Sequence, residues 1–179
     1  MVVRSLISLL LLLPVTVMAS NTWVLVDTNN ETVSVLQAGQ TVLQLKGAAF
    51  GRGGVSDLRQ RGDGRTPLGS FHIVSINRNS HYHLYFGLNY PTLSQAEAGL
   101  QQGLIDQLAF DEIARAIANG QIPPQDTPLG GNIGIHGVGN GSLGVHKRFN
   151  WTQGCVALTN EQIEKLAAWL EIGTRVVIQ

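Results

Sequence analysis

The sequence is poor in cysteine, in aromatic side chains and in charge, and each shortage excludes a class of protein. One cysteine among 179 residues cannot form an internal disulfide or supply a cysteine-rich zinc site. Twelve basic side chains are balanced by twelve acidic ones. The chain therefore lacks the basic face with which nucleic-acid-binding proteins displace counterions from phosphates. With 44% hydrophobic residues it is also too apolar to be disordered, so we expect a folded domain that binds no nucleic acid.

Long hydrophobic runs are also missing, except near the N-terminus. There Arg4 precedes an apolar run from Leu6 to Leu13, and small residues follow it. This order is typical of a secretory signal peptide, here over residues 1–19. Pro14 interrupts a run already shorter than the roughly 20 residues that span a bilayer, which favours a cleaved signal over a membrane anchor. We expect an exported protein of the periplasm or cell envelope, with no stable membrane insertion and one domain over residues 20–179.

The sequence does contain a series of short β-strand patterns separated by turns. Alternating apolar and β-branched residues predict strands over residues 22–27, 31–36, 41–50, 69–77, 81–88, 132–136 and 174–178. Helical spacing predicts two helices over about 94–103 and 106–119, and a third that begins near Thr159 or Asn160. We therefore expect an α+β domain, mainly β, with a mostly antiparallel sheet or β-sandwich, a helical insertion in the middle and a helix after the cysteine.

Local signals mark where some helices and loops begin and end. Ser94 with Glu97 forms a capping-box pattern, and Gly120 is a typical helix-ending glycine. Residues 51–64 hold five glycines, three arginines and two aspartates, which predicts an exposed and mobile loop. A second long loop is expected over residues 137–154.

Two side chains of reactive type, His136 and Cys155, lie at the two ends of this second loop. A thiol with its ordinary pKa of about 8.5 is mostly protonated at neutral pH, and a histidine within reach can take that proton and later return it to a leaving group. Gly154 allows the backbone to bend so that N–H groups near the cysteine face an oxyanion. From these residues alone, an acyl-transfer site and a buried thiol beside a core histidine both remain open.

The segments around both residues resemble the L,D-transpeptidase (YkuD-type) catalytic domain. Pro128–Gly137 is similar to the approach to that family's histidine, and Thr152–Cys155 is similar to its Ser/Thr-His-Gly-Cys signature. Upstream, Gly62–Phe71 resembles the Thr-Pro-x-Gly-x-Phe segment at the start of a strand, and Leu88–Pro91 resembles a Tyr-Pro element. These motifs occur in the family's order, and the resemblance covers nearly all of residues 20–179.

The resemblance implies an exported cysteine acyltransferase that acts on peptidoglycan stem peptides without a cofactor or a metal. Cys155 would be the nucleophile and His136 its base, oriented by the backbone carbonyl of Gly137. N–H groups around Gly154 and Cys155 would form the oxyanion hole, and Thr152 takes the Ser/Thr position. Cys155 would attack the L-centre carbonyl of the third stem residue, usually diaminopimelate, and expel D-alanine. An amine of a second stem would then take the acyl group from the thioester.

Two positions depart from the family pattern, so the sequence is similar to a branch with a relaxed Thr-Gln-Gly-Cys signature. Gln153 stands where histidine is usual, and it can donate a hydrogen bond but cannot carry a proton. Ala157 stands where arginine is frequent, which removes a cation that could hold a substrate carboxylate. One alternative is hydrolysis, either by an L,D-carboxypeptidase or by an amidase that releases a cell-wall-linked protein. The alternative from another class is an inactive cell-wall binding module.

Other polar side chains are candidates for substrate contact. Tyr82, His83 and Tyr90 are expected to border the cleft, because the resemblance places their segment near the active site. His146, Lys147 and Arg148 form a basic cluster before the cysteine that could capture a substrate carboxylate. His81 and His83 share one face of a predicted strand, but no third ligand accompanies them, so we predict no metal site.

Overall fold

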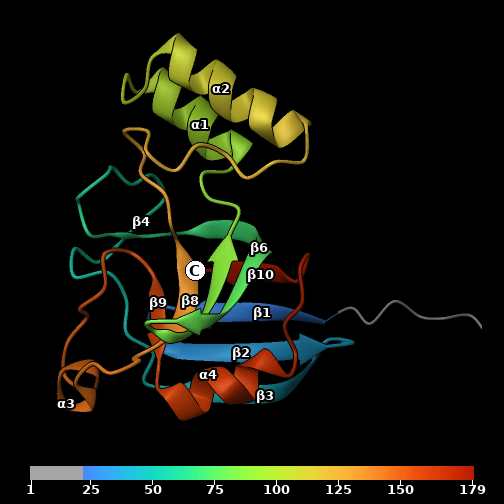
Figure 1. Ribbon diagram of the computed structural model, residues 1–179, viewed down its shortest axis with the longest axis vertical. Helices are drawn as coiled ribbons and strands as arrows, with labels where there is room; N and C mark the ends of the chain where they lie inside the picture. Colours follow the sequence, from blue (N-terminus) through green and yellow to red (C-terminus); the bar gives the residue numbers. More distant parts are fainter. Residues whose placement is uncertain (1–21) are drawn as a thin grey trace, which may run out of the picture.

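A mixed β-sheet forms the body of the protein in the computed structural model, which describes residues 22–179 (Figure 1). Its strands are β1 (Thr22–Asp27), β2 (Thr32–Gln37), β3 (Gln40–Lys46), β6 (Gly69–Ser80), β7 (His83–Leu88), β8 (Gly134–Gly137), β9 (Val156–Leu158) and β10 (Arg175–Ile178). Their order is β3-β2-β1-β10-β6-β7-β8-β9. The pairs β1–β10 and β8–β9 are parallel, and the other five neighbouring pairs of this sheet are antiparallel. The prediction of a mainly β, mostly antiparallel fold is confirmed.

Strand β6 connects the two halves of this sheet. Its first residues, from Gly69 to His72, pair with β10, and the ladder with β7 runs from Ile73 to Ser80 with two shifts of register. Such irregularities bend and twist a strand. Beyond β3, Ala49 forms a bridge with Ala157 in β9, so the chain after one edge strand reaches the opposite edge strand. The sheet therefore folds over on itself and encloses a core.

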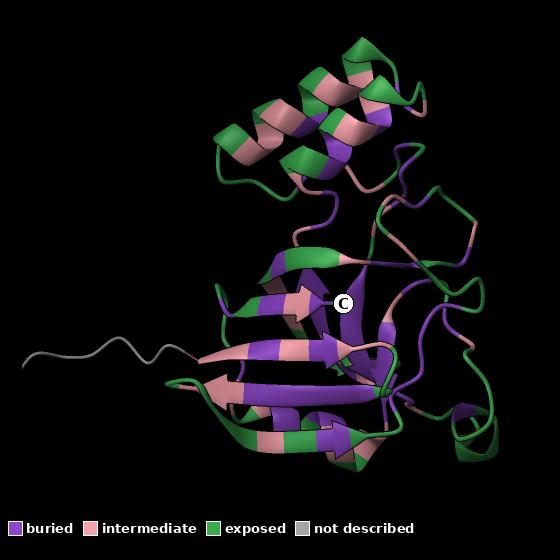
Figure 2. Ribbon diagram, turned by 180° about the vertical axis from the view of Figure 1, so that it is seen from behind, coloured by how far each residue is buried: buried purple, intermediate pink, exposed green. Residues whose placement is uncertain are grey.

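The main core lies inside this folded sheet and beneath the C-terminal helix. Valines of β1 and β2 and apolar residues of β6 to β10 are almost fully buried, and Ile163 and Leu166 of α4 (Asn160–Ala167) join them. Figure 2 shows the middle of the sheet as mostly buried. Thr159 caps α4 and forms a capping box with Gln162, as the sequence predicts for the start of this helix. Because α4 follows β9 directly, its N-terminus lies beside the strand that the cysteine precedes.

The predicted helical insertion is a pair of helices, α1 (Leu93–Gln101) and α2 (Gln107–Ala118), that stands clear of the sheet in Figure 1. It has a small core of its own, made by Ala96, Ile105, Ile113 and Leu129. Helix α1 begins earlier than the Ser94–Glu97 pattern predicts. Thr92 is the N-cap, and its hydroxyl accepts a hydrogen bond from the N–H of Gln95 while the Gln95 side chain accepts one from the N–H of Thr92. The glutamine completes the capping box as well as a glutamate does.

The two long loops differ from the sequence-based expectation. Residues 51–64 contain β4 (Val55–Ser56), which pairs with β5 (Thr66–Pro67), and the side chain of Arg59 is only 4% exposed. The prediction of an exposed loop is therefore wrong at Arg59. The loop after β8 contains the short helix α3 (Leu143–His146), where Ser142 accepts a hydrogen bond from the N–H of Val145. Both loops are folded by contacts with distant residues, which local sequence patterns do not report.

Residues 1–21 lie outside the described part of the chain, so the predicted signal peptide over residues 1–19 does too. Among residues 22–179, none of the helices has the length and apolar character needed to cross a membrane.

Candidate active site

The parallel pairing of β8 with β9 brings the histidine and the cysteine together. His136 of β8 is in register with Ala157 of β9, and Ile135 is in register with Val156. Cys155 immediately precedes β9, and neighbouring strands are only about 4.8 Å apart. His136 and Cys155 both line one cavity of about 720 Å³, together with Tyr82, Tyr85 and other residues. The sheet thus brings two residues that are nineteen positions apart in the sequence to the same cavity.

The His136 ring is buried and held in one orientation. Its Nδ1 atom lies 2.7 Å from the carbonyl oxygen of Gly137, so the hydrogen bond expected between these two residues is present. A carbonyl oxygen only accepts, so the proton is on Nδ1 and Nε2 carries the free lone pair. The ring stacks on Tyr82 with the centroids 4.2 Å apart, and Trp151 approaches it edge-on. Burial lowers the pKa of His136, which keeps the imidazole neutral and able to accept a proton.

The thiol of Cys155 is protonated in this arrangement. Its Sγ atom donates a hydrogen bond to the carbonyl oxygen of Asn132 at 3.3 Å. Burial raises the pKa of the thiol to about 11, although a hydrogen bond from the backbone of Gly134 and the positive charge of Arg59 act in the opposite direction. Histidine and cysteine are therefore a neutral pair, and the thiol proton points to Asn132 and not to His136.

The turn that presents the cysteine depends on Thr152. Its hydroxyl donates to the carbonyl oxygen of Cys155 at 2.7 Å and accepts a hydrogen bond from the N–H of Gly154 at 3.1 Å. The N–H of Gly154 is thus already used, which removes it from the predicted set of oxyanion donors. Gly154 has φ of 126°, and a Cβ there would lie 2.5 Å from the carbonyl oxygen of Arg65 and 2.9 Å from Nη1 of Arg59. Only glycine fits this position.

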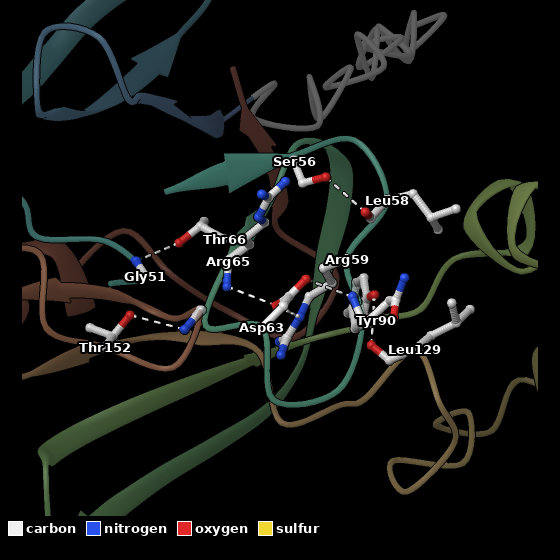
Figure 3. A network of polar contacts seen from close by, with 12 residues as sticks. Gly51, Ser56, Leu58, Arg59, Asp63, Arg65, Thr66, Tyr90, Leu129 and Thr152 are labelled. Atoms are coloured by element: carbon white, nitrogen blue, oxygen red, sulfur yellow. Dashed lines mark hydrogen bonds and ion pairs between the residues drawn. The ribbon is translucent and has the colours of Figure 1, made fainter. Parts of the chain in front are cut away.

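Arg59 is a member of the site that the sequence analysis missed. Its side chain reaches the cavity from the loop over residues 51–64, and its guanidinium carbon lies 5.8 Å from the centre of the Tyr90 ring (Figure 3). Its nearest acidic neighbour is Asp63, with Nε and Oδ1 3.6 Å apart. An arginine in a glycine-rich loop carries no local pattern that marks it as buried. A buried position follows only from the contacts made by the folded loop.

The structure places the remaining predicted residues in different surroundings. Gln153 lines the cavity, as expected for a substrate contact. Tyr90 is fully buried and donates from its hydroxyl to the carbonyl oxygen of Leu129, so it supports the cavity from behind and does not line it. His83 pairs with Glu164 at 2.6 Å, with both side chains substantially exposed, and is not part of the cavity wall.

The basic cluster before the cysteine also faces elsewhere. Lys147 and Arg148 line a separate pocket of about 340 Å³ together with Phe149 and Gln162. The structure does not bring either cation to the cavity that holds Cys155. The positions of these two side chains give no support to their predicted role in holding a substrate carboxylate.

A second, more apolar pocket adjoins the cavity. Its volume is about 550 Å³, and Val138, Val145 and Ser142 contribute to its walls. Tyr82 and Trp151 line this pocket and the cysteine cavity alike. Both side chains pack against the His136 ring, so the two compartments meet beside His136.

No metal-binding group is formed by the histidines near the cavity. Across residues 22–179, no three histidine, cysteine, aspartate or glutamate side chains gather closely enough to hold a metal ion. His81 instead packs edge-on against Tyr82, and His83 is paired with Glu164.

The protein is thus a mainly β domain in which a large mixed sheet brings a cysteine and a histidine to one cavity. The family model of the L,D-transpeptidase catalytic domain (YkuD) matches residues 21–178, so the chain belongs to that family. The family expected from the sequence motifs is thereby confirmed.

Solved structures with a similar fold come from several bacteria. Bd1075 of Bdellovibrio bacteriovorus has a TM-score of 0.58 and 21% identity, with 89% of this chain and 48% of that chain covered. The helical cell shape determining protein Pgp2 of Campylobacter jejuni has a TM-score of 0.57 and 22% identity, with 88% and 47% covered. This chain thus spans about half the length of either protein. No curated protein matches the sequence.

Proposed function

We propose that this protein is a cysteine acyltransferase that acts on peptidoglycan stem peptides as an L,D-transpeptidase. The observation that carries the proposal is the shared cavity of Cys155 and His136, on neighbouring parallel strands of a domain that belongs to the L,D-transpeptidase family. The neutral His136, with Nδ1 bound to Gly137, has the protonation state that a general base needs. The intact pair speaks against an inactive binding module.

The first half-reaction forms a thioester. Nε2 of His136 takes the thiol proton while Sγ of Cys155 bonds to the L-centre carbonyl carbon of the third stem residue. The resulting oxyanion is stabilised by the backbone N–H of Cys155, since that of Gly154 donates to Thr152. The tetrahedral intermediate then collapses, the bond to D-alanine breaks, and the proton on Nε2 passes to the departing amine.

The second half-reaction releases the acyl group. An amine of another stem attacks the thioester carbonyl, His136 takes the proton of that amine, and the thiolate leaves and recovers the proton. Water in place of the amine makes the enzyme an L,D-carboxypeptidase, and a protein-linked substrate makes it an amidase. The apolar pocket that shares Tyr82 and Trp151 with the cavity favours transpeptidation, because it offers a second ligand its own approach to the base.

The proposal includes an exported protein of the periplasm or cell envelope. The signal-peptide pattern over residues 1–19 supports export, and the substrate is found in that compartment. The partners are stem peptides and, for the amidase alternative, a protein linked to the cell wall.

Product analysis tests this function directly. The purified protein is incubated with muropeptides that carry tetrapeptide stems, and the products are separated by mass. We expect 3→3 cross-linked dimers and free D-alanine, both abolished in Cys155→Ser. Tripeptides without dimers would identify the carboxypeptidase. The amidase would instead release the protein from peptidoglycan that carries a covalently linked protein, which is incubated separately. In parallel, a carbapenem should form a covalent adduct on Cys155, and the absence of both adduct and turnover would support the binding module instead.

A further inference from the structure

We propose that Arg59 binds a carboxylate of the substrate at the wall of the Cys155 cavity. It would provide, from a different loop, the cation that is missing at Ala157. This inference rests on the proposed function, because it assigns a ligand group to the same cavity. The expected carboxylate is the C-terminal one of the D-alanine leaving group, which lies next to the bond that breaks.

The first observation is that two nitrogens of the Arg59 guanidinium are buried without a hydrogen-bond partner. The side chain is 4% exposed, and neither Nε nor Nη1 has an acceptor among the described residues. Asp63 does not fill this role. Its Oδ1 atom is 3.6 Å from Nε, and its two oxygens accept hydrogen bonds from the N–H groups of Gln60 and Arg65. A buried cation with unsatisfied donors is costly, and an anionic ligand removes that cost.

The second observation is that the guanidinium is held in place beside the nucleophile. It lies over the Tyr90 ring, and that ring is anchored by its hydrogen bond to the carbonyl of Leu129 (Figure 3). Glycines stand on two sides of it: a Cβ at Gly154 would lie 2.9 Å from Nη1, and a Cβ at Gly130 would lie 3.5 Å from Nη2. Gly154 directly precedes the cysteine. The absence of side chains at these positions leaves room for the arginine to reach the cavity.

The third observation is the charge of the cavity wall. Arg59 and Arg61 line it, and none of its lining residues in the described part of the chain is acidic, although Asp63 lies behind Arg59. Nη1 of Arg61 donates to the carbonyl oxygen of Asp126 at 2.8 Å, and Arg61 is exposed, so Arg59 is the cation of this wall that has buried donors without a partner. A stem peptide offers carboxylates as its anionic groups, and a planar guanidinium can bind a carboxylate through two parallel hydrogen bonds.

A purely structural role for Arg59 makes a different prediction. If the arginine only held the loop over residues 51–64 against Tyr90, its loss would weaken the binding of every substrate alike. If it binds a carboxylate, its loss must weaken only the substrates that carry that group. The test therefore compares substrates that differ in one charge.

The experiment measures binding by calorimetry in the Cys155→Ser background, which makes it independent of turnover. Three synthetic stem tetrapeptides serve as ligands: one with free carboxylates, one with the D-alanine carboxamide and one with the diaminopimelate side-chain carboxylate amidated. We expect the D-alanine carboxamide to bind about 10- to 100-fold more weakly than the free acid, the range for a charge-assisted hydrogen bond. Arg59→Gln should weaken binding of the free acid by the same factor. It should change the affinity for the carboxamide by no more than about twofold. Arg59→Lys should fall between them, because lysine offers a point charge without the planar fork.

The control is Arg115→Gln, which removes one positive charge from the exposed surface of α2 and should change none of the three affinities. If the diaminopimelate amide binds more weakly than the free acid, and Arg59→Gln removes that difference, Arg59 binds the diaminopimelate carboxylate instead. Equal affinities for all three peptides in the otherwise native protein would overturn the proposal without any Arg59 variant. If the protein with native Cys155 shows no turnover but the free acid still binds more tightly than the carboxamide, the proposed function is contradicted and the role of Arg59 is not.

Discussion

The hydroxyl of Thr152 donates a 2.7 Å hydrogen bond to the carbonyl oxygen of Cys155, three residues further along the chain. The hydroxyl oxygen of Thr152 also accepts a hydrogen bond from the N–H of Gly154. One buried side chain therefore holds the backbone on both sides of the peptide bond that precedes the thiol. This turn presents the cysteine to the cavity although Gln153 replaces the histidine usual in the family.

Replacement of Thr152 by valine should weaken this turn. Both hydrogen bonds are lost and two backbone groups are left without this partner, so we expect a loss of about 1–3 kcal/mol in the free energy of unfolding. The rate at which a carbapenem acylates Cys155 should fall as well. Urea unfolding and mass spectrometry measure the two effects. Thr152→Ser keeps the hydroxyl and serves as the control, and a valine variant with native acylation would contradict the role assigned to this side chain.

Replacement of Gly154 by alanine should be far more damaging than replacement of a glycine with free space around it. At Gly154 the new Cβ would lie 2.5 Å from a backbone oxygen, in addition to the strain at φ of 126°. At Gly120, φ is 66° and no atom lies within 4 Å, so only the left-handed conformation penalises alanine, by about 1–2 kcal/mol. Urea unfolding of both variants checks the difference, and equal losses would refute the packing argument.

The alkylation of Cys155 should depend steeply on pH. Because burial raises the pKa of the thiol to about 11, the rate of alkylation by iodoacetamide should still rise well above pH 8.5 and reach half of its maximum near pH 11. His136→Ala removes the base and should slow alkylation at neutral pH much more than at pH 11. Equal neutral-pH rates in both proteins would show that His136 does not act as the base.

Acid should destabilise the fold through its buried histidines. Burial lowers the pKa of His136, so the unfolded chain takes up a proton at a higher pH than the folded protein does. The contribution to stability is complete above pH 6.5 and is lost as the pH falls from 6.5 towards the lower pKa of the folded state. Urea unfolding at pH 7.5 and pH 5 should show this loss, and His136→Gln should reduce it.

His146 should account for part of the acid-induced loss of stability that remains in His136→Gln. Its pKa is also lowered by burial, so the sign of its effect is the same. The double variant His136→Gln/His146→Gln should have the flattest dependence between pH 7.5 and pH 5. A slope unchanged from the native protein would contradict the assignment to these two rings.

Local sequence patterns predicted much of the fold because they depend on contacts between near neighbours. The alternation of apolar and polar residues predicts strands such as β1 and β2, and the residues around Thr159 predict the start of α4. The first helix was placed two residues late, since Ser94 and Glu97 match the capping pattern while Thr92 and Gln95 form the actual cap. Near neighbours in sequence offered two competing caps, and the backbone conformation decided between them.

The sequence by itself determined the family and singled out His136 and Cys155 as candidates, because both residues stand in contiguous motifs. Only the tertiary structure decided which other side chains surround them. It turned His83 toward Glu164, put Lys147 and Arg148 on another pocket, buried Tyr90 and brought Arg59 against Gly154. The physical reason is that these contacts join segments far apart in the chain. These contacts form when the sheet folds on itself and the loop over residues 51–64 packs against it. Local sequence periodicity predicts neither arrangement.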